Sequence, residues 1–313
     1  MYETEIFRSG FDSSGIHVWG WEIAVYLFLG GMTAGLMIIA PLLSRRVPEE
    51  RQSRALRLLP FAAPVLLSLG MLALLLDLEF ELHVFRFYTA LRITSPMSWG
   101  AWILLLIYPA TLGLGSARLS AEETLSLVSR WPRLSPAFSS VLSWTRRNVE
   151  ALERLNVILG VALGAYTGIL LGTLAARALW SSMWLAPLFL ISGFSAGAAA
   201  TMLLPTTSEE RDQLRRWDVM AMAAEIGALA IFFIDLASDG GERGRAAAAL
   251  FFGGPYTAFF WAVVVIAGLG MPMALETIES RRHVNAAVLA PVLLLIGGLA
   301  LRWIFVLAGQ AAV

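Results

Sequence analysis

Hydrophobic segments long enough to cross a membrane recur along almost the whole chain. A helix needs about 20 mainly apolar residues to cross the hydrocarbon core of a bilayer. The pattern therefore predicts an all-α integral membrane protein with eight transmembrane helices. These spans run over residues 19–43, 56–79, 97–117, 154–177, 184–205, 217–237, 256–276 and 286–309.

The composition agrees with this pattern. The chain is 58% hydrophobic and 15% charged, with a mean hydropathy of +0.71, which is well above the balance of a soluble domain. The first 18 residues are polar and mixed, so we expect no cleavable signal peptide. The net charge is zero, so we expect no nucleic-acid partner.

The arginines are distributed unevenly between alternate connections. Of the 23 basic residues, all of which are arginine, 16 lie in or beside the connections after the first, third, fifth and seventh spans. The positive-inside rule places these connections in the cytoplasm. Both termini are therefore expected on the outer (periplasmic) side. The long connection over 118–153 mixes Trp, Phe and Leu with Ser, Pro and Arg, which predicts an interfacial amphipathic segment.

Three motifs occur twice with nearly constant separation. The offsets are 162, 158 and 159 residues, and the pairs are GMTAG (31–35) with GFSAG (193–197), LLDL (75–78) with FIDL (233–236), and Pro96…Trp102 with Pro255…Trp261. Four spans return a chain to its starting side, so the repeats predict two tandem, parallel four-helix bundles within one membrane domain. The glycines of the first pair would allow two helix backbones to approach closely.

These repeats divide the chain into three parts. Residues 1–153 hold the first three spans and the long connection of the first repeat, residues 154–183 hold its fourth span, and residues 184–313 form the second repeat.

Ionisable side chains gather at one predicted depth, in the outer half of the membrane. Such groups are costly in a bilayer and are therefore candidates for function. The stretch 74–102 combines acids, a histidine and arginines with apolar segments, and it becomes apolar again at Trp99. The outer group consists of Glu22, Asp77, Asp235, Arg302, Tyr166, His17 and His83. Glu225 and Glu276 lie in the inner half.

These side chains are of the types that a quinone-binding site needs. Its two carbonyl oxygens need hydrogen-bond donors, its protons need a carboxylate, and its ring needs an apolar slot. We expect Asp77, Glu22 and Tyr166 to do the chemistry. The quinone-binding candidates are His17, Tyr166, His83, Trp99 and Arg302. A proton path would use Asp235, Glu225 and Glu276.

Each of these groups also has a purely structural interpretation. Asp77 and Asp235 could form a structural pair with Arg302, or Arg302 could extend to the membrane surface. Tyr166 could be a packed aromatic residue with a satisfied hydroxyl. Glu225 and Glu276 could form hydrogen bonds between helices.

Metal cofactors are not expected in this chain. With no cysteine, it has no ligands for an Fe–S cluster or a thiolate metal site. Haem is disfavoured because bis-histidine ligation needs two facing histidines inside the bundle, and His283 lies in a predicted connection.

Five sequence motifs together resemble the NrfD/polysulfide reductase family of membrane subunits, and the resemblance covers all eight spans. They are YLFLGGMTAG (26–35), Asp77-Leu78 with SPMSWGAW (95–102), GAYTGILL (164–171), SGFSAGAA (192–199) and GGLALRWIFVLAGQ (297–310).

The resemblance implies a quinone-reactive anchor without a redox cofactor of its own. It implies a multi-pass protein of the bacterial or archaeal cytoplasmic (inner) membrane that exchanges electrons between menaquinone or ubiquinone and an Fe–S subunit on the outer face. That subunit would join a molybdopterin-type catalytic subunit, typically in anaerobic respiration. The family's quinone site uses a span-four tyrosine, a position that Tyr166 matches. Where the family has Asn and His at the start of span one, this chain has His17, Trp19 and Glu22.

Two other functions remain as alternatives. One is a proton-translocating module coupled to quinone chemistry. The other is a solute transporter built from parallel repeats, which predicts discontinuous helices and a midplane substrate site.

Overall fold

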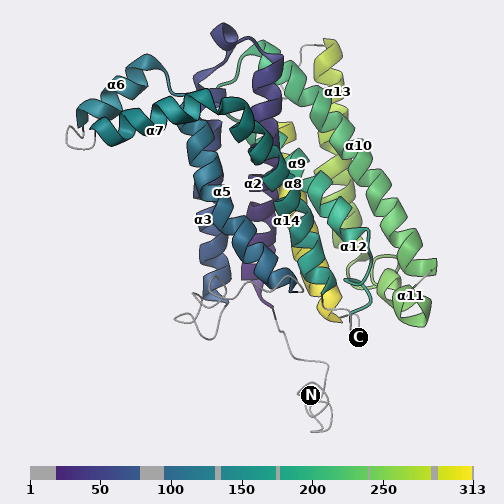
Figure 1. The fold of residues 1–313 in the computed structure, drawn as a ribbon. Helices are drawn as coiled ribbons and strands as arrows, with labels where there is room; N and C mark the ends of the chain where they lie inside the picture. The colour runs from purple at the N-terminus through teal and green to yellow at the C-terminus, as the bar shows by residue number, and fades with distance from the viewer. Residues whose placement is uncertain are drawn as a thin grey trace.

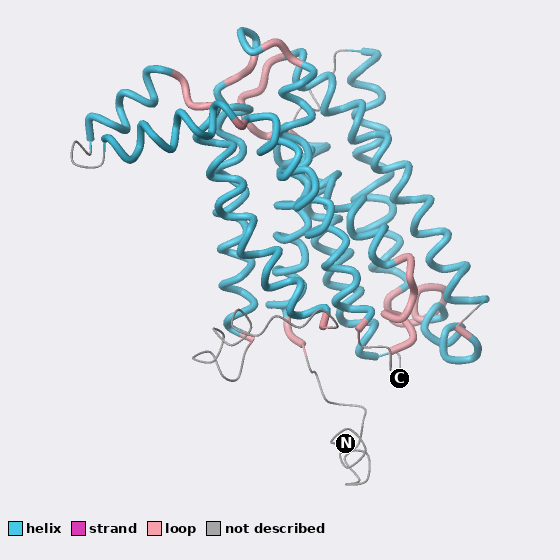
Figure 2. Tube along the Cα trace, viewed as in Figure 1, coloured by secondary structure: helices cyan, strands magenta, loops and turns pink. Residues whose placement is uncertain are grey.

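The described part of the chain is helical throughout (Figures 1 and 2). The computed structural model describes residues 19–77, 95–130, 135–173, 177–238, 240–282 and 288–311. The long helices are α2(Trp21–Arg46), α3(Arg54–Leu76), α5(Pro96–Ala117), α8(Val149–Gly172), α9(Leu185–Met202), α10(Ser208–Ser238) and α14(Leu289–Ala311). Shorter elements are η1(Glu49–Arg51), α6(Ala121–Arg130), α7(Ser135–Arg147), α11(Gly241–Ala249), α12(Thr257–Phe259), the π-helical η4(Phe260–Gly270) and α13(Met271–Arg282).

Eight helices in the described residues are long and apolar enough to cross a membrane. Seven are the long helices above, and α12, η4 and α13 together form the eighth, over Thr257–Ile278. Each predicted span corresponds to one of them, so the all-α, eight-helix prediction is confirmed. The arrangement as two parallel repeats, the division into parts and the membrane side of the termini stay predictions.

The largest difference in boundaries is at α10, which begins at Ser208 rather than at residue 217. A capping box explains the earlier start: the Glu210 carboxylate accepts a hydrogen bond from the Thr207 N–H (2.9 Å), and the Glu210 N–H donates to Thr207 Oγ1 (3.3 Å). The Glu210 side chain also accepts from the Ser53 N–H (2.7 Å), which ties the start of α10 to the start of α3.

The start of α2 and the end of α14 lie at the same end of the bundle (Figure 1). There the Trp19 N–H donates to Gln310 Oε1, and Gln310 Nε2 donates to the Trp19 carbonyl, both at 3.0 Å. Trp19 also packs on Trp180, with ring centroids 5.1 Å apart. We call this the terminal end of the bundle, and the opposite end, where α2 reaches Arg45 and Arg46, the arginine-rich end.

The two glycine motifs pack directly against each other. A Cβ on Gly31 would lie 3.5 Å from the Gly193 Cα, and a Cβ on Gly197 would lie 2.7 Å from the Gly35 Cα. Helices α2 and α9 therefore cross with their backbones in contact, as small residues permit inside a membrane.

Helices α6 and α7 form a hairpin that projects sideways from the arginine-rich end (Figure 1). On α7 the exposed fractions of Val141 and Trp144 are 54% and 56%, whereas Leu142 is buried. The predicted amphipathic segment is thus a pair of helices with apolar side chains on its surface. Its place at the membrane surface stays a prediction.

Candidate functional site

Tyr166 lies in the terminal half of the bundle, between α8 and α5. Its side chain is 6% exposed, and it occupies the space in front of Gly100 so closely that a Cβ there would overlap the phenol ring and hydroxyl. Pro96 at the start of α5 sets where that helix begins, and it places Gly100 on the second turn. The tyrosine hydroxyl is therefore positioned by the absence of a side chain on the facing helix.

Two carboxyl groups meet at the same end of the bundle. Asp77 follows directly after α3, and Glu22 lies in the first turn of α2. Partial burial and the nearby negative charge of Glu22 raise the pKa of Asp77, while a hydrogen bond from the Gly20 backbone lowers it by less. A raised pKa makes Asp77 a better proton acceptor than an ordinary aspartate.

The structure brings together some of the predicted quinone-site residues. Asp77 and Glu22 are neighbours, and Tyr166 on α8 and Trp99 on α5 come from the same end of the adjoining helices. Trp99 is 43% exposed. His17 and His83 lie outside the described residues.

Arg302 belongs to another environment, between α14 and α9. It is 2% exposed; Nη2 donates to the Phe189 carbonyl at 3.0 Å, and the guanidinium carbon lies 3.8 Å from the centroid of the Phe189 ring. Its charge interacts with Glu225, which is hydrogen-bonded to Ser192. Arg302 does not extend to the surface, and these contacts place it with the second-half helices rather than with Asp77.

A string of buried acids continues from Glu225 toward the arginine-rich end. Asp218 on α10 is fully buried, and its Oδ1 accepts a hydrogen bond from Ser195 Oγ on α9 at 2.5 Å. Glu276 on α13, which is 2% exposed, lies close enough to Asp218 for the two carboxyl groups to interact. The predicted path residues Glu225 and Glu276 are thus joined through Asp218.

Sequence reasoning missed Asp218 because the predicted span began at 217 and left this residue at the helix end. With α10 starting at Ser208, Asp218 lies about 15 Å inside the helix at a rise of about 1.5 Å per residue. The capping residues Thr207 and Glu210 were the local signal for the true start. The seven-residue spacing of Asp218 and Glu225 puts both on one helix face.

Asp235, the counterpart of Asp77 in the predicted repeat, has a hydrogen-bond partner of its own. Its Oδ2 accepts from Ser182 Oγ at 2.5 Å, beside a small cavity of about 250 Å³. It lies near the terminal end of α10, away from the interior acids. This bond, rather than a pairing with Arg302, accounts for its position.

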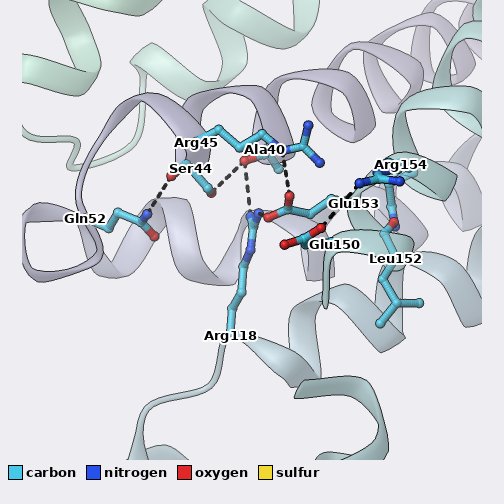
Figure 3. Close-up of polar contacts among 10 residues, drawn as sticks. Ala40, Ser44, Arg45, Gln52, Arg118, Glu150, Leu152, Glu153 and Arg154 are labelled. Atoms are coloured by element: carbon cyan, nitrogen blue, oxygen red, sulfur yellow. Dashed lines mark hydrogen bonds and ion pairs between the residues drawn. The ribbon is translucent and has the colours of Figure 1, made fainter. Parts of the chain in front are cut away.

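A partly buried ionic network that the sequence did not reveal lies at the arginine-rich end (Figure 3). Glu153 on α8 accepts from Arg45 Nε at 2.7 Å and from Arg118 Nη2 at 2.9 Å. Arg118 Nη1 also donates to the Ala40 carbonyl at 3.1 Å. The network ties α2, α5 and α8 together where they leave the apolar part of the bundle.

No group of three or more His, Asp or Glu side chains arranged for a metal ion occurs within the described ranges. The chemistry that the terminal end offers is hydrogen bonding and proton transfer, from the phenol of Tyr166 and the carboxyl groups of Asp77 and Glu22.

Comparison with known proteins gives one consistent match. Residues 10–313 match the family model described as "Polysulphide reductase, NrfD". Protein NrfD of Escherichia coli (strain K12) is 35% identical over 307 residues, covering 95% of this chain and 96% of the relative. The C subunit of polysulfide reductase from Wolinella succinogenes is 29% identical over 312 residues, covering 95% of each protein. Together with the eight apolar helices, this match makes the chain a multi-pass protein of the bacterial inner membrane.

Proposed function

Because the chain belongs to the NrfD/polysulfide reductase family, we propose that it is the quinone-reactive membrane subunit of a respiratory oxidoreductase. Membrane subunits of this family are generally quinone-interacting anchors of oxidoreductase complexes. This chain would exchange electrons between menaquinone or ubiquinone and an Fe–S subunit docked on the terminal end, which would carry them to or from a molybdopterin-type subunit.

One observation carries this proposal: a buried tyrosine hydroxyl and a carboxyl pair occur together at one end of the bundle. The Tyr166 hydroxyl, held against Gly100, can donate a hydrogen bond to a quinone carbonyl oxygen. Asp77, with Glu22 beside it, can exchange protons with the outer surface. Oxidising one quinol releases two electrons, which pass to the Fe–S partner, and two protons, which leave through the carboxyl pair.

The terminal end also offers contacts for a protein partner. The exposed side chains of Arg243 and Arg245 lie on α11, beside the end of α10. Cationic side chains on a docking face favour a partner with acidic surface groups. We expect Arg86 and Arg92, in the predicted outer connection between the second and third spans, to offer further contacts; both lie outside the described residues.

The proposal is tested on the complex isolated through a tag on this chain. We expect an Fe–S subunit to co-purify. We also expect Tyr166→Phe and Asp77→Asn each to slow quinol oxidation by about 100-fold or more, since a positioned proton-transfer group contributes about 100-fold at the lower end of its usual range. Tyr108→Phe and Asp212→Asn are matched controls, because Tyr108 contacts Ser68 and Asp212 contacts Arg215 elsewhere in the chain. If both site variants oxidise quinol at the rate of the controls, these residues do not form the quinone site.

We also propose a second candidate function, proton transfer through the second half of the chain. The connected string of Glu225, Asp218 and Glu276 favours it, since such chains of ionisable groups inside a membrane serve as proton relays. In sealed vesicles, Asp218→Asn should reduce the protons released per quinol while the rate of electron transfer persists in uncoupled vesicles. An unchanged proton yield would mean that the string is structural.

A further inference from the structure

A large polar cavity opens at the arginine-rich end, opposite the proposed quinone site. Its volume is about 830 Å³, and it lies between the end of α2, the start of α3, the connection after α5 and the start of α8. Five arginines line it and only two glutamates, so its charge is strongly positive. The arginines are Arg45, Arg46, Arg57, Arg118 and Arg146, and the acids are Glu49 and Glu153.

Hydrogen bonds and ion pairs within the described part of the protein do not pair all of these arginines. Glu153 already pairs with Arg45 and Arg118. In contrast, Arg57 Nε is shielded from solvent and has no hydrogen-bond partner in the described ranges. Arg46 is exposed and forms no ion pair within those ranges. The positive charge that lines the cavity therefore exceeds the negative charge that the protein supplies there.

Two apolar grooves adjoin the cavity. One, of about 590 Å³, shares Arg45 and Arg46 with it and continues along Phe194 and Trp217. The other, of about 510 Å³, shares Leu119 with it and runs beneath the α6–α7 hairpin, where Val141 forms part of its wall. A ligand that fills both kinds of space must have an anionic group joined to hydrocarbon.

We propose that this cavity binds the headgroup phosphate of an anionic membrane phospholipid, whose acyl chains occupy the adjoining apolar grooves. Guanidinium groups bind phosphate through directed, charge-assisted hydrogen bonds, and basic pockets between transmembrane helices bind anionic lipid headgroups. The grooves argue against a small soluble anion as the natural ligand, because such an anion would leave them uncovered. On the arginine distribution, the lipid belongs to the cytoplasmic leaflet.

The test uses the full chain in detergent and follows lipid retention by native mass spectrometry. Phosphatidylglycerol and phosphatidylcholine with identical acyl chains are titrated separately. We expect phosphatidylglycerol to bind at about tenfold lower concentration, and Arg46→Gln/Arg57→Gln to weaken its binding by about tenfold or more. Arg154→Gln is the matched control, because Arg154 is exposed and pairs with Glu150 outside the cavity. If the double variant does not fold, Arg46→Gln alone provides the test, since that side chain is exposed.

A second arm separates a lipid from a free phosphate ion. Val141→Gln makes the groove beneath the hairpin polar without changing its charge, so it should weaken binding of phosphatidylglycerol. Millimolar inorganic phosphate should displace the lipid only partly. Equal binding of the two lipids, or equal behaviour of the double variant and Arg154→Gln, would overturn the proposal. Full displacement by inorganic phosphate, with no effect of Val141→Gln, would assign the cavity to a small anion instead.

Discussion

The Arg302 guanidinium lies over the ring of Phe189, with its carbon 3.8 Å from the ring centroid, and also donates a hydrogen bond to the backbone carbonyl of the same residue. Its Nε and Nη1 have no hydrogen-bond partner within the described residues. A buried cation with so few bonds depends on a nearby negative charge, which Glu225 supplies. This arrangement fixes α14 against α9 and α10.

Removing one member of this buried charge pair should destabilise the protein. We expect Arg302→Met to lower the free energy of unfolding by about 3–5 kcal/mol, because Glu225 is left buried without its counter-charge. The double variant Arg302→Met/Glu225→Gln should recover much of the loss. Thermal unfolding in detergent measures both, and an unchanged melting temperature for Arg302→Met would show that the pair contributes nothing.

The crossing of α2 and α9 should not tolerate even one added methyl group. Gly35→Ala places its Cβ against the Gly193 and Gly197 backbone, which cannot move aside as a side chain can. We expect a loss of about 1–3 kcal/mol, typical of overpacking. Gly227→Ala on α10 is the control, because its Cβ has no atom within 4 Å. That variant should be unchanged or slightly more stable in the same thermal assay.

Gly100 should control the proposed quinone chemistry through Tyr166. In Gly100→Ala the new Cβ displaces the phenol ring, and a shift of about 1 Å in a reacting geometry can cost about 100-fold in rate. Gly113→Ala on the same helix is the control, because its Cβ first meets the flexible end of Leu152 at 3.3 Å. Quinol oxidation by the complex is the measurement. Equal rates in the two variants would mean that the position of Tyr166 is unimportant.

Glu22 should set the pH at which Asp77 accepts protons. Its negative charge disfavours ionised Asp77 and so raises the pKa of that group. Glu22→Gln removes this effect, and the acid limb of the pH–rate profile for quinol oxidation should move to lower pH. Glu242→Gln on the exposed surface of α11 is a control with the same change of charge.

The raised pKa of Asp77 also determines how the stability of the folded protein changes with pH. A folded-state pKa raised above the ordinary value of 3.8 means that the folded protein holds this proton more tightly than the unfolded chain. The contribution of Asp77 to stability is therefore largest at acid pH, and it is lost as the pH rises through the folded-state pKa. In Glu22→Gln this loss should become smaller. A pH dependence of unfolding equal to wild type would contradict the coupling of the two carboxyl groups.

Glu153 should contribute more to stability than its neighbour Glu150. Burial lowers the pKa of Arg118, and the hydrogen bond and charge of Glu153 oppose that effect. Glu153→Gln leaves this guanidinium without its counter-charge, so we expect a loss of about 3–5 kcal/mol. Glu150→Gln removes only an exposed pair with Arg154 and should change stability by less than about 1 kcal/mol. Comparable unfolding temperatures for both variants would contradict this difference.

Local features of the sequence were enough to predict the helices and part of their packing. Apolar length identified each span, because the bilayer sets a minimum length that does not depend on neighbouring helices. The capping pair Thr207 and Glu210 shows that even the start of α10 was encoded locally. The repeated motifs at Gly31 and Gly193 indicated close helix contact, and the structure brings these two glycines together.

The partners of the ionisable groups depended on the tertiary structure. The sequence around Arg302 does not indicate that this side chain lies over Phe189. Likewise, the sequence around Tyr166 does not indicate that Gly100 faces the tyrosine. Asp218 belongs to a buried polar cluster only because helix packing brings Ser195 from α9 and Glu276 from α13 beside it. Hydropathy is a property of each segment, whereas a buried charge is stabilised by groups that helix packing brings together from distant parts of the chain.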